Sequence, residues 1–513
     1  MLLIRLLVKV SLVTLVSRIL GFVRDITIAR VFGINWMLDS FLLAFKLPNL
    51  FRKIFSDGIL LQVFVPVLTK YKNNGNLIDT YNFIAYISGL FIILLLIVII
   101  ITIFFMPKII ILIAPGFIKK KYILLLTIKL SRVIFPYIIL ILFITFTSAI
   151  LNVWGYEVIS LTTSIFLNIS MITFTLLFNN LFSTPILGLA WSVIIGGIIQ
   201  LCYQLIFLKK INMLVFPKFN FNYKKLFNLL KNISTVIIIN SINQISNIIN
   251  TIFASFFVSG SLSWIYYADR IIELPAGLLI TSLNTILLPI LSRSFIQNDM
   301  NNYLKQLNWG IKLCFIFVIP STIALIILSY PIVITLFQYN NFSVHDLCMI
   351  QKLLSVYSTG LIGLVLTKLL TISFYSRNNT KVLIKMSLII IVLTQIMNIL
   401  FVYIFDNLGL SISNIVSYYI QVIFLYFYLL KNKLFFFNYN VANFLFKIII
   451  SVLVMSFILI KLLALMPSWD NISIFYRLIR ISLLIMIGIL VYFFTLWITG
   501  LKLKEIFYFY YNF

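Results

Sequence analysis

The sequence is short of acidic residues: only 12 of its 513 residues are Asp or Glu, and there is a single histidine, His345. So few carboxylates and one imidazole argue against an enzyme that relies on acid/base pairs or on a histidine-built metal site. The three cysteines, Cys202, Cys314 and Cys348, lie far apart and offer neither metal-ligand spacing nor a disulfide framework. We therefore expect packing cysteines, no cofactor and no metal.

Apolar sequence is what the chain has in abundance, since 62% of its residues are hydrophobic. A helix needs ~20 apolar residues to cross a hydrocarbon core about 30 Å thick. Runs such as "FIAYISGLFIILLLIVIIITIFFM" from Phe83 and "ISLLIMIGILVYFFTLWITG" from Ile481 are long enough. The N-terminal predicted helix carries Arg18, Arg24 and Asp25 and has no cleavage-site pattern. We therefore expect it to be retained rather than removed as a signal peptide. The sequence predicts an all-α polytopic membrane protein.

Hydropathy predicts fourteen transmembrane helices. They are expected at about 10–31, 38–68, 82–106, 122–151, 159–179, 186–208, 232–257, 266–292, 308–330, 350–374, 382–404, 409–430, 441–465 and 475–500. The connections that follow even-numbered spans are rich in Lys and Arg, whereas the opposite connections are nearly free of cations apart from Lys119 to Lys121 and nearby Lys108. Because basic loops stay in the cytoplasm, this pattern places both termini there and explains most of the net charge of +27.

The two halves of the chain resemble each other in sequence. "LGLAWSVIIGGIIQ" at 187–200 matches "LGLSISNIVSYYIQ" at 408–421, and "FKLPN" at 45–49 matches "IELPA" at 272–276. Collinear matches of this kind predict two parallel six-helix repeats, related by an axis along the membrane normal, with a site at the interface of the two lobes. The expected domains are an N-lobe at 1–208, a cytoplasmic linker at 209–231, a C-lobe at 232–433 and two extra helices at 434–513.

Several charges fall inside the predicted spans. A charge at the bilayer centre costs ~2.5–3.5 kcal/mol on insertion scales, so these side chains are expected to face protein or a water-filled cavity. Some pairs, such as Lys53 with Asp57 or Arg18 with Asp25, have an alternative explanation as structural ion pairs, but pairing does not account for the whole set, in which cations outnumber acids. The candidate cavity residues are Arg18, Arg24, Asp39, Lys46, Arg52, Asp57, Arg270, Glu273 and Lys368.

Arginine is concentrated at the start of the chain: five of the eleven arginines lie in the first 52 residues. Its planar guanidinium binds phosphate oxygens with two parallel hydrogen bonds, which lysine does not do. Pro48 removes a backbone hydrogen bond between Lys46 and Arg52 and is expected to kink the helix there. These features favour a cationic cavity for a phosphate or pyrophosphate substrate.

The same segments resemble a known family. "VSRILGFVRDITIARVFG", "DSFLLAFKLPNLFRKIF", "SGSLSWIYYADRIIELPAG" and "ILLPILS" are similar to the MurJ (MviN) lipid II flippases of bacteria, which belong to the multidrug/oligosaccharidyl-lipid/polysaccharide exporter superfamily. The resemblance covers essentially the whole chain. It implies fourteen helices in two lobes, a lipid-facing groove made by the last two, and alternating-access movement of undecaprenyl-pyrophosphate-linked disaccharide-pentapeptide from the inner to the outer leaflet for peptidoglycan synthesis.

The family's essential residues are carried over by matching motif. The resemblance implies that the essential cavity arginines are Arg18, Arg24, Arg52 and Arg270, and that an essential acid is Asp39. It also implies a monomer in the bacterial cytoplasmic (inner) membrane, with lipid II as partner and with coupling to the membrane potential or to a monovalent ion. The asparagines of the seventh span, Asn240, Asn243, Asn247 and Asn250, either help to bind such an ion or serve helix packing.

The chain departs from the family pattern at two places. Asp57 stands where a glutamate is usual, which shortens the reach of that carboxylate by one methylene. Ile372-Ser373 stands where Pro-Gly is common, which is expected to stiffen the tenth helix.

Two other classes of function are alternatives. A drug or small-cation antiporter, or another polyprenyl-linked oligosaccharide flippase, would share the superfamily fold, but an antiporter needs a cavity dominated by carboxylates. A polytopic lipid-modifying enzyme needs an acid/base pair or metal near the membrane surface, and the sequence offers no acidic cluster in an external loop.

Overall fold

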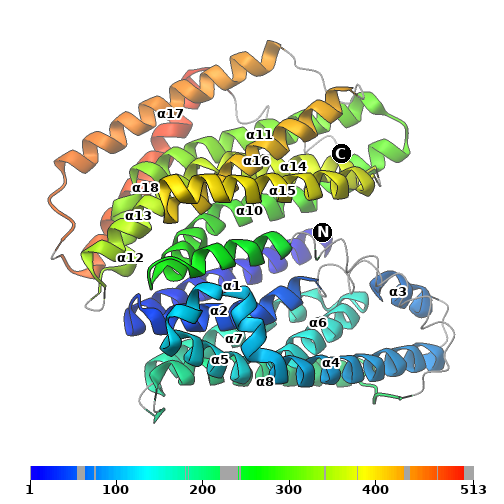
Figure 1. Ribbon diagram of the computed structural model, residues 1–513. Helices are drawn as coiled ribbons and strands as arrows, with labels where there is room; N and C mark the ends of the chain where they lie inside the picture. The colour runs from blue at the N-terminus through cyan, green and yellow to red at the C-terminus, as the bar shows by residue number, and fades with distance from the viewer. Residues whose placement is uncertain are drawn as a thin grey trace. The chain divides into compact units, whose positions relative to one another are not determined.

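The computed structural model describes residues 2–54, 64–73, 77–178, 181–182, 184–219, 241, 244–339, 342–377, 379–431, 439–470 and 472–501. Within these ranges the chain is almost entirely helical (Figure 1). The predicted all-α class is therefore confirmed. Asp57 lies outside the described residues, as do Asn240 and Asn243.

Among its described residues, the first part of the chain has nine helical elements and one further helical segment at 244–255. The elements are α1 (Leu2–Phe32), α2 (Trp36–Ile54), α3 (Val65–Asn73), α4 (Leu77–Ile113), η2 (Pro115–Lys119), α5 (Lys121–Ile134), α6 (Tyr137–Val153), α7 (Glu157–Leu177) and α8 (Pro185–Lys210). The second part contains α10 (Ser261–Ile296), α11 (Met300–Ile327), α12 (Ser329–Phe337), α13 (Val344–Thr359), α14 (Leu361–Tyr375), α15 (Thr380–Phe405), α16 (Asn407–Lys431), α17 (Tyr439–Leu465) and α18 (Ile474–Ile498).

Ten stretches of the described helices are long and apolar enough to cross a membrane, and α13 with α14, which meet at a bend of 42°, would make eleven. The chain is therefore a multi-pass membrane protein. Neither α1 nor α2 is among these stretches, and both interrupt their apolar sequence with charged residues. The total of fourteen spans stays a prediction.

Two breaks inside predicted spans have local causes. Pro136 separates α5 from α6, because it has no N–H to continue the helical ladder. The bend of 42° lies at Gly360, where a Cβ atom would come within 2.6 Å of the Ile415 side chain. By contrast, α14 runs without interruption through Ile372 and Ser373, so the bend of this pair lies more than two turns before the place where the family commonly has Pro-Gly.

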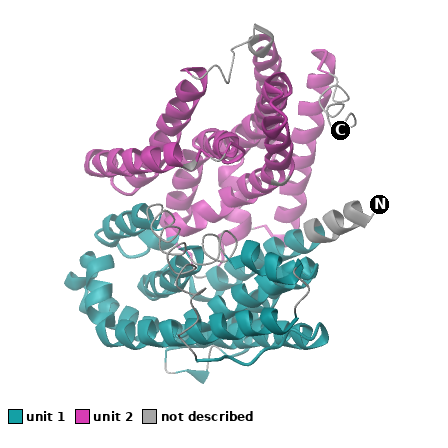
Figure 2. Cartoon of the chain, turned by 90° about the vertical axis from the view of Figure 1, so that its right-hand side faces the viewer, with its two compact units in different colours: residues 1–263 teal, residues 264–513 magenta. Residues whose placement is uncertain are grey.

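The chain divides into two compact units, Met1–Ser263 and Trp264–Phe513 (Figure 2). In unit 1, α7 packs on both α1 and α8, α6 packs on α8, and α2 packs on α5. The helical segment at 244–255, expected to open the C-lobe, belongs to unit 1 by its contacts. A buried cluster lies among α3, α4 and α6, where the Phe64 ring stacks on Phe83 and lies 4.9 Å from Phe146.

The chain beyond α8 runs along the beginning of α4. The hydroxyl of Tyr81 donates to the carbonyl of Asn212 (2.6 Å), and the N–H of Lys218 donates to the carbonyl of Ala85 (2.9 Å). Gly89 allows this approach, because a Cβ atom there would overlap the Lys218 carbonyl. The start of the predicted linker is thus fixed to unit 1 at residues 212–218.

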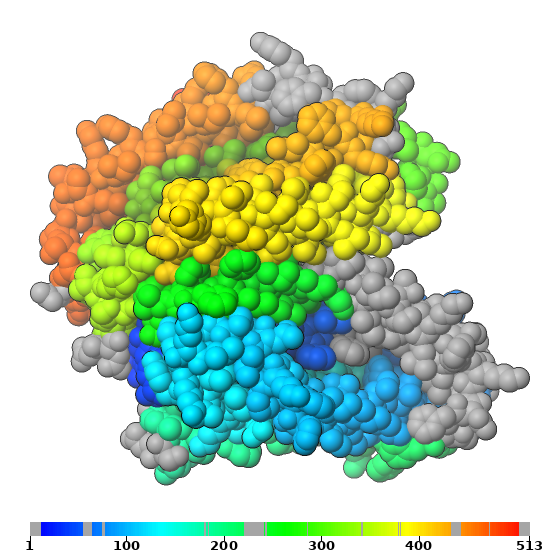
Figure 3. Space-filling view, in the orientation of Figure 1, coloured from blue at the N-terminus to red at the C-terminus, as the bar shows by residue number. Residues whose placement is uncertain are grey.

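In unit 2, α15 packs on α16, and α14 packs on α16 and α11. The side chains of α15, coloured yellow, form much of the face of this unit seen in Figure 3. Large apolar side chains of α15 are exposed, including Val392, Ile396 and Ile399, as expected for a helix in contact with lipid.

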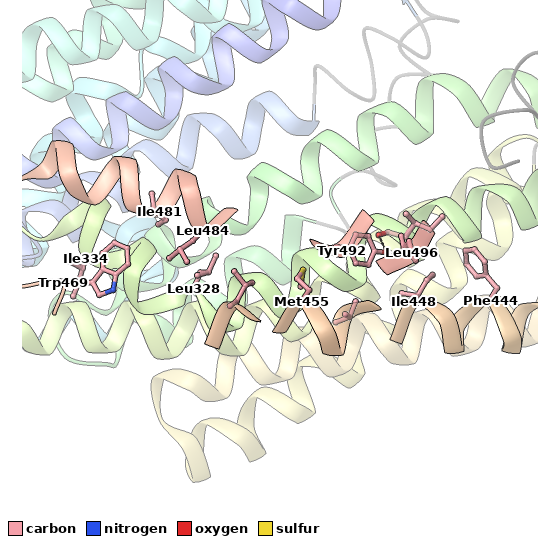
Figure 4. Close-up of a cluster of buried hydrophobic side chains, with 13 residues drawn as sticks. Leu328, Ile334, Phe444, Ile448, Met455, Trp469, Ile481, Leu484, Tyr492 and Leu496 are labelled. Atoms are coloured by element: carbon pink, nitrogen blue, oxygen red, sulfur yellow. Dashed lines mark hydrogen bonds between the residues drawn. The ribbon is translucent and has the colours of Figure 1, made fainter. Parts of the chain in front are cut away.

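The last two helices, α17 and α18, pack together and against α11 and α12 (Figures 1 and 4). Their buried cluster contains Ile448, Met455, Leu484 and Leu496, all apolar. One directional contact supplements the apolar packing, since the Tyr492 hydroxyl donates to the carbonyl of Ile316 at 2.7 Å.

Candidate functional site

The nine candidate cavity residues are divided between the two units. Unit 1 holds Arg18, Arg24, Asp39, Lys46 and Arg52, and unit 2 holds Arg270, Glu273 and Lys368. Asp57 lies outside the described residues. In unit 1 the described candidate side chains come from α1 and α2, and each of these helices interrupts its apolar sequence with several charges.

Arg24 is buried at the contact between α1 and α7. Its Nε and Nη2 atoms donate to the carboxylate of Asp25 at 2.9 and 2.6 Å, and its Nη1 donates to Asn168 Oδ1 on α7 at 3.1 Å. Arg24 is only 8% exposed and Asp25 only 2%. A buried cation needs a partner of opposite charge, and here the neighbouring residue supplies it.

Arg18 lies two turns before this pair on α1 and is half-buried. The preceding residue, Ser17, joins α1 to α7 because its hydroxyl lies 2.6 Å from that of Ser164 and its carbonyl accepts from Asn168 Nδ2 (3.3 Å). Asn168 therefore contacts both turns of α1. Asn168 was not among the predicted site residues, because nothing in its local sequence connects it with Arg24.

Asp39 caps the start of α10 from another helix. Its carboxylate accepts hydrogen bonds from the N–H of Gly260, from the N–H of Ser263 (2.9 Å) and from the Ser263 hydroxyl (2.6 Å). The first N–H groups of a helix have no partner within the helix, and a negative charge there is favoured by the helix dipole. Asp39 is 2% exposed, so it is a buried and fully engaged carboxylate rather than one open to a substrate.

Lys46, two turns after Asp39 on α2, reaches the helical segment at 244–255. Its ammonium donates to the Thr251 hydroxyl at 2.6 Å and to the carbonyl of Asn247 at 3.4 Å. The side-chain amide of Asn247 donates to Gln244 (3.3 Å) within the same segment. The proposed ion-binding role of the asparagine face is not tested by these contacts and stays a prediction.

The turn between this segment and α10 is also held by the connection from α4 to α5. The N–H of Gly116 donates to the Ser255 hydroxyl at 3.0 Å, and Lys120 donates to the carbonyl of Phe257 at 3.0 Å. A Cβ atom at Gly116 would overlap the carbonyl of Ser255, so only glycine permits this backbone approach. In unit 1, residues 247–263 are therefore fixed by α2, η2 and the residue after η2.

Arg52 and its neighbour Lys53 stand at the end of α2, where Arg52 is half-buried and Lys53 exposed. Pro48 is buried within α2, which continues past it to Ile54. The ring of Phe51 makes an edge contact with Phe135 at 5.9 Å.

In unit 2, Arg270 and Glu273 form an ion pair of 2.7 Å one turn apart on α10, with side chains 30% and 57% exposed. Lys368 is exposed on α14. Among the residues that the structure describes, no three His, Cys, Asp or Glu side chains gather closely enough to hold a metal ion.

Three comparisons bear on the family of this chain. A family model described as "Lipid II flippase MurJ" matches residues 28–480. A curated relative from Buchnera aphidicola subsp. Baizongia pistaciae, named "Probable lipid II flippase MurJ", is 41% identical over 499 residues, covering 97% of each chain. The "Lipid II flippase MurJ" of Burkholderia cenocepacia is 32% identical over 413 residues, covering 80% of each.

Solved structures agree with these matches. "Lipid II flippase MurJ, inward closed conformation" superposes with a TM-score of 0.79 at 27% identity and covers 95% of this chain and 98% of that chain. "Inward-facing conformation of a multidrug resistance MATE family transporter of the MOP superfamily" superposes with a TM-score of 0.64 at 13% identity, covering 82% and 97%, which shows a shared fold alone. On the family model and on relatives that match over nearly its whole length, the chain belongs to the MurJ family.

Proposed function

We propose that this chain is a lipid II flippase that moves the lipid-linked peptidoglycan precursor from the inner to the outer leaflet of the cytoplasmic membrane. Family membership over residues 28–480 carries the proposal. The reaction moves a lipid without changing its covalent structure, so we assign no catalytic residue. The few acids and the single histidine of the sequence agree with this reading.

The proposed architecture has fourteen spans in two parallel repeats of six, followed by two further helices. The apolar stretches found among the described helices support it, together with α1, α2 with α3, and the segment at 244–255 as three more spans. On this topology both termini are cytoplasmic, and the basic connections lie on the same side. The packing of α17 and α18 on α11 and α12 agrees with their being an addition to the second lobe.

The proposed substrate site is a cationic cavity that binds the pyrophosphate of lipid II. Half-buried Arg18 and Arg52 in unit 1, and Arg270 in unit 2, are the main candidates, with Lys368, Glu273 and Asp57 as further lining residues. Guanidinium groups bind phosphate oxygens in bidentate geometry, and a low-dielectric site strengthens that attraction.

The contacts in unit 1 lead us to propose different roles for three of the nine candidates. Arg24 is neutralised by Asp25 and fixed by Asn168, so its role is to anchor α1. Asp39 and Lys46 hold the chain at 247–263, so they act by placing that segment rather than by touching the substrate. Alternating access requires such contacts to be stable in one state and replaceable in another.

The oligomeric state and the energy source of transport are further parts of the proposed function. We propose that the protein works as a monomer and draws on the membrane potential or a monovalent ion. Charged side chains within the spans, such as Arg18 and Arg270, would respond to the potential if they move through the membrane, since one elementary charge moved across it changes in energy by ~2.3 kcal/mol per 100 mV.

The test measures lipid II in the outer leaflet of bacterial cells whose own flippase is depleted. We expect the parent chain to restore the outer-leaflet signal, and Arg18→Ala and Arg52→Ala to reduce it strongly at equal expression. Lys53→Ala is the matched control, because it removes the same charge from an exposed position beside Arg52. A restored signal that is insensitive to Arg18→Ala and Arg52→Ala would refute the cationic cavity, and no signal from well-folded parent would refute the function.

A further inference from the structure

One face of α10 is buried and the opposite face is charged. Trp264, Tyr267, Ala268 and Ile271 are nearly inaccessible. Asp269, Arg270 and Glu273 are exposed or partly exposed on the other side. Which residues of α10 reach the proposed substrate therefore depends on the rotation and depth of the helix within unit 2.

Apolar burial is non-directional, so it fixes small changes in that rotation less sharply than a hydrogen bond does. A shift of one residue along a helix amounts to about 1.5 Å and 100°. Arg270 stands six residues after Trp264, or about 9 Å along the axis. A directional contact near the start of the helix would fix both its rotation and its depth.

Unit 2 contains such a contact. The indole N–H of Trp264 donates to Asp346 Oδ1 at 2.8 Å, and the two residues are 3% and 9% exposed. The indole N–H has one direction only, so it fixes the azimuth of the helix as well as its depth. The ring of His345 makes an edge contact with the same indole at 5.4 Å.

Asp346 is itself immobilised. Its Oδ2 accepts from the main-chain N–H (3.2 Å) and the hydroxyl (2.6 Å) of Ser343, while the Asp346 N–H donates to the Ser343 hydroxyl at 3.1 Å. This reciprocal arrangement is the capping box of α13. The capping box uses Oδ2 of Asp346 and leaves Oδ1 for Trp264. The hydrogen bond therefore joins α10 to the first turn of α13, which the box holds rigid.

We propose that Trp264 and Asp346 are positioning residues for transport: their hydrogen bond sets the rotation and depth of α10 and so places Arg270 and Glu273. The inference rests on the proposed function, because placing these two side chains matters only if they act on the substrate. It assigns a role to a tryptophan and an aspartate that stand outside the predicted cavity set.

The test compares two neighbouring cysteine reporters on α10. In a background carrying Cys202→Ser, Cys314→Ala and Cys348→Ser, single cysteines replace buried Ala268 or exposed Asp269, and each is labelled with a small methanethiosulfonate. The ratio of the labelling rate at 269 to that at 268 reports the rotation. Trp264→Phe and Asp346→Ala are each expected to lower this ratio at least about tenfold. This is the lower end of the effect expected when a hydrogen bond to a charged group is lost. The matched controls are Asp346→Asn, which keeps an oxygen for the indole, and Trp191→Phe at an exposed tryptophan of α8.

The same substitutions are then measured for lipid II exposure in flippase-depleted cells. The proposal stands if the ratio and the transport rate fall together in Trp264→Phe and Asp346→Ala, are largely kept in Asp346→Asn, and fall no further in the double variant. An unchanged ratio, or a changed ratio with full transport, overturns it. If the parent exposes no lipid II, the proposed function has failed, and the labelling ratio alone decides whether the bond orients α10.

Discussion

Removing the Asp39 carboxylate is expected to release the start of α10. In Asp39→Ala the N–H groups of Gly260 and Ser263 lose their acceptor in a buried site. The Ser263 hydroxyl also loses its acceptor, but it can rotate toward a different one and is left out of the count. Each unsatisfied buried N–H costs roughly 1–3 kcal/mol, so the two together cost roughly 2–6 kcal/mol. The local opening equilibrium of this turn should therefore increase by at least about 30-fold, at 1.4 kcal/mol for each factor of ten.

Amide hydrogen exchange of the purified protein measures that equilibrium directly. We expect protection at Gly260 and Ser263 to fall by at least about 30-fold in Asp39→Ala, and by less in Asp39→Asn, which keeps one side-chain oxygen. Ser40→Ala is the control, because the neighbouring hydroxyl only donates to Trp36 within α2 (2.9 Å). Equal exchange at Gly260 and Ser263 in Asp39→Ala and Ser40→Ala would show that the carboxylate does not hold this turn.

Three further outcomes are expected. Lys46→Met keeps the length of the side chain but removes both hydrogen bonds to the 244–255 segment, so transport should fall in the lipid II exposure assay without loss of expression, and unchanged transport would contradict the anchoring role. Gly116→Ala places a methyl group on the Ser255 carbonyl and should lower the free energy of unfolding by about 1–3 kcal/mol, visible as a lower Tm, whereas an unchanged Tm would mean that the connection moves freely. Tyr492→Phe removes one buried hydrogen bond to Ile316 and should cost about 1 kcal/mol in the same measurement, with the exposed Tyr403→Phe as control.

Hydropathy was sufficient to predict the helical class and most spans, because a run such as Phe83–Met106 has no stable alternative to a membrane helix. It did not predict that one such span extends over Leu77–Ile113, or that a glycine at position 360 bends another. Helix ends and bends depend on neighbouring helices, such as the approach of the Ile415 side chain to Gly360, which no local pattern encodes.

For the candidate site, the sequence was sufficient to predict several residues but not the contacts that they make. Intramembrane charge was enough to select Arg24, Asp39 and Lys46, because such residues must face protein or water. Their roles were not readable from the sequence, since the partners lie far along the chain: Asn168 for Arg24, Ser263 for Asp39 and Thr251 for Lys46. The carboxylate that caps α10 comes from residue 39 rather than from a local side chain.

The length of α4 has a mechanical consequence. Its 37 residues extend over about 55 Å, whereas the hydrocarbon core is about 30 Å thick. Apart from Leu77 and Ile78 in its first turn, its large exposed apolar side chains lie at Leu94–Leu112, so the excess falls toward the beginning of the helix, where Ala85 and Gly89 hold the chain at Lys218. Such an overhang turns a change in helix tilt into a displacement of the chain that leads toward the second unit. Because tilt follows the mismatch between helix and bilayer, membrane thickness is expected to influence the position of residues 212–218 in unit 1.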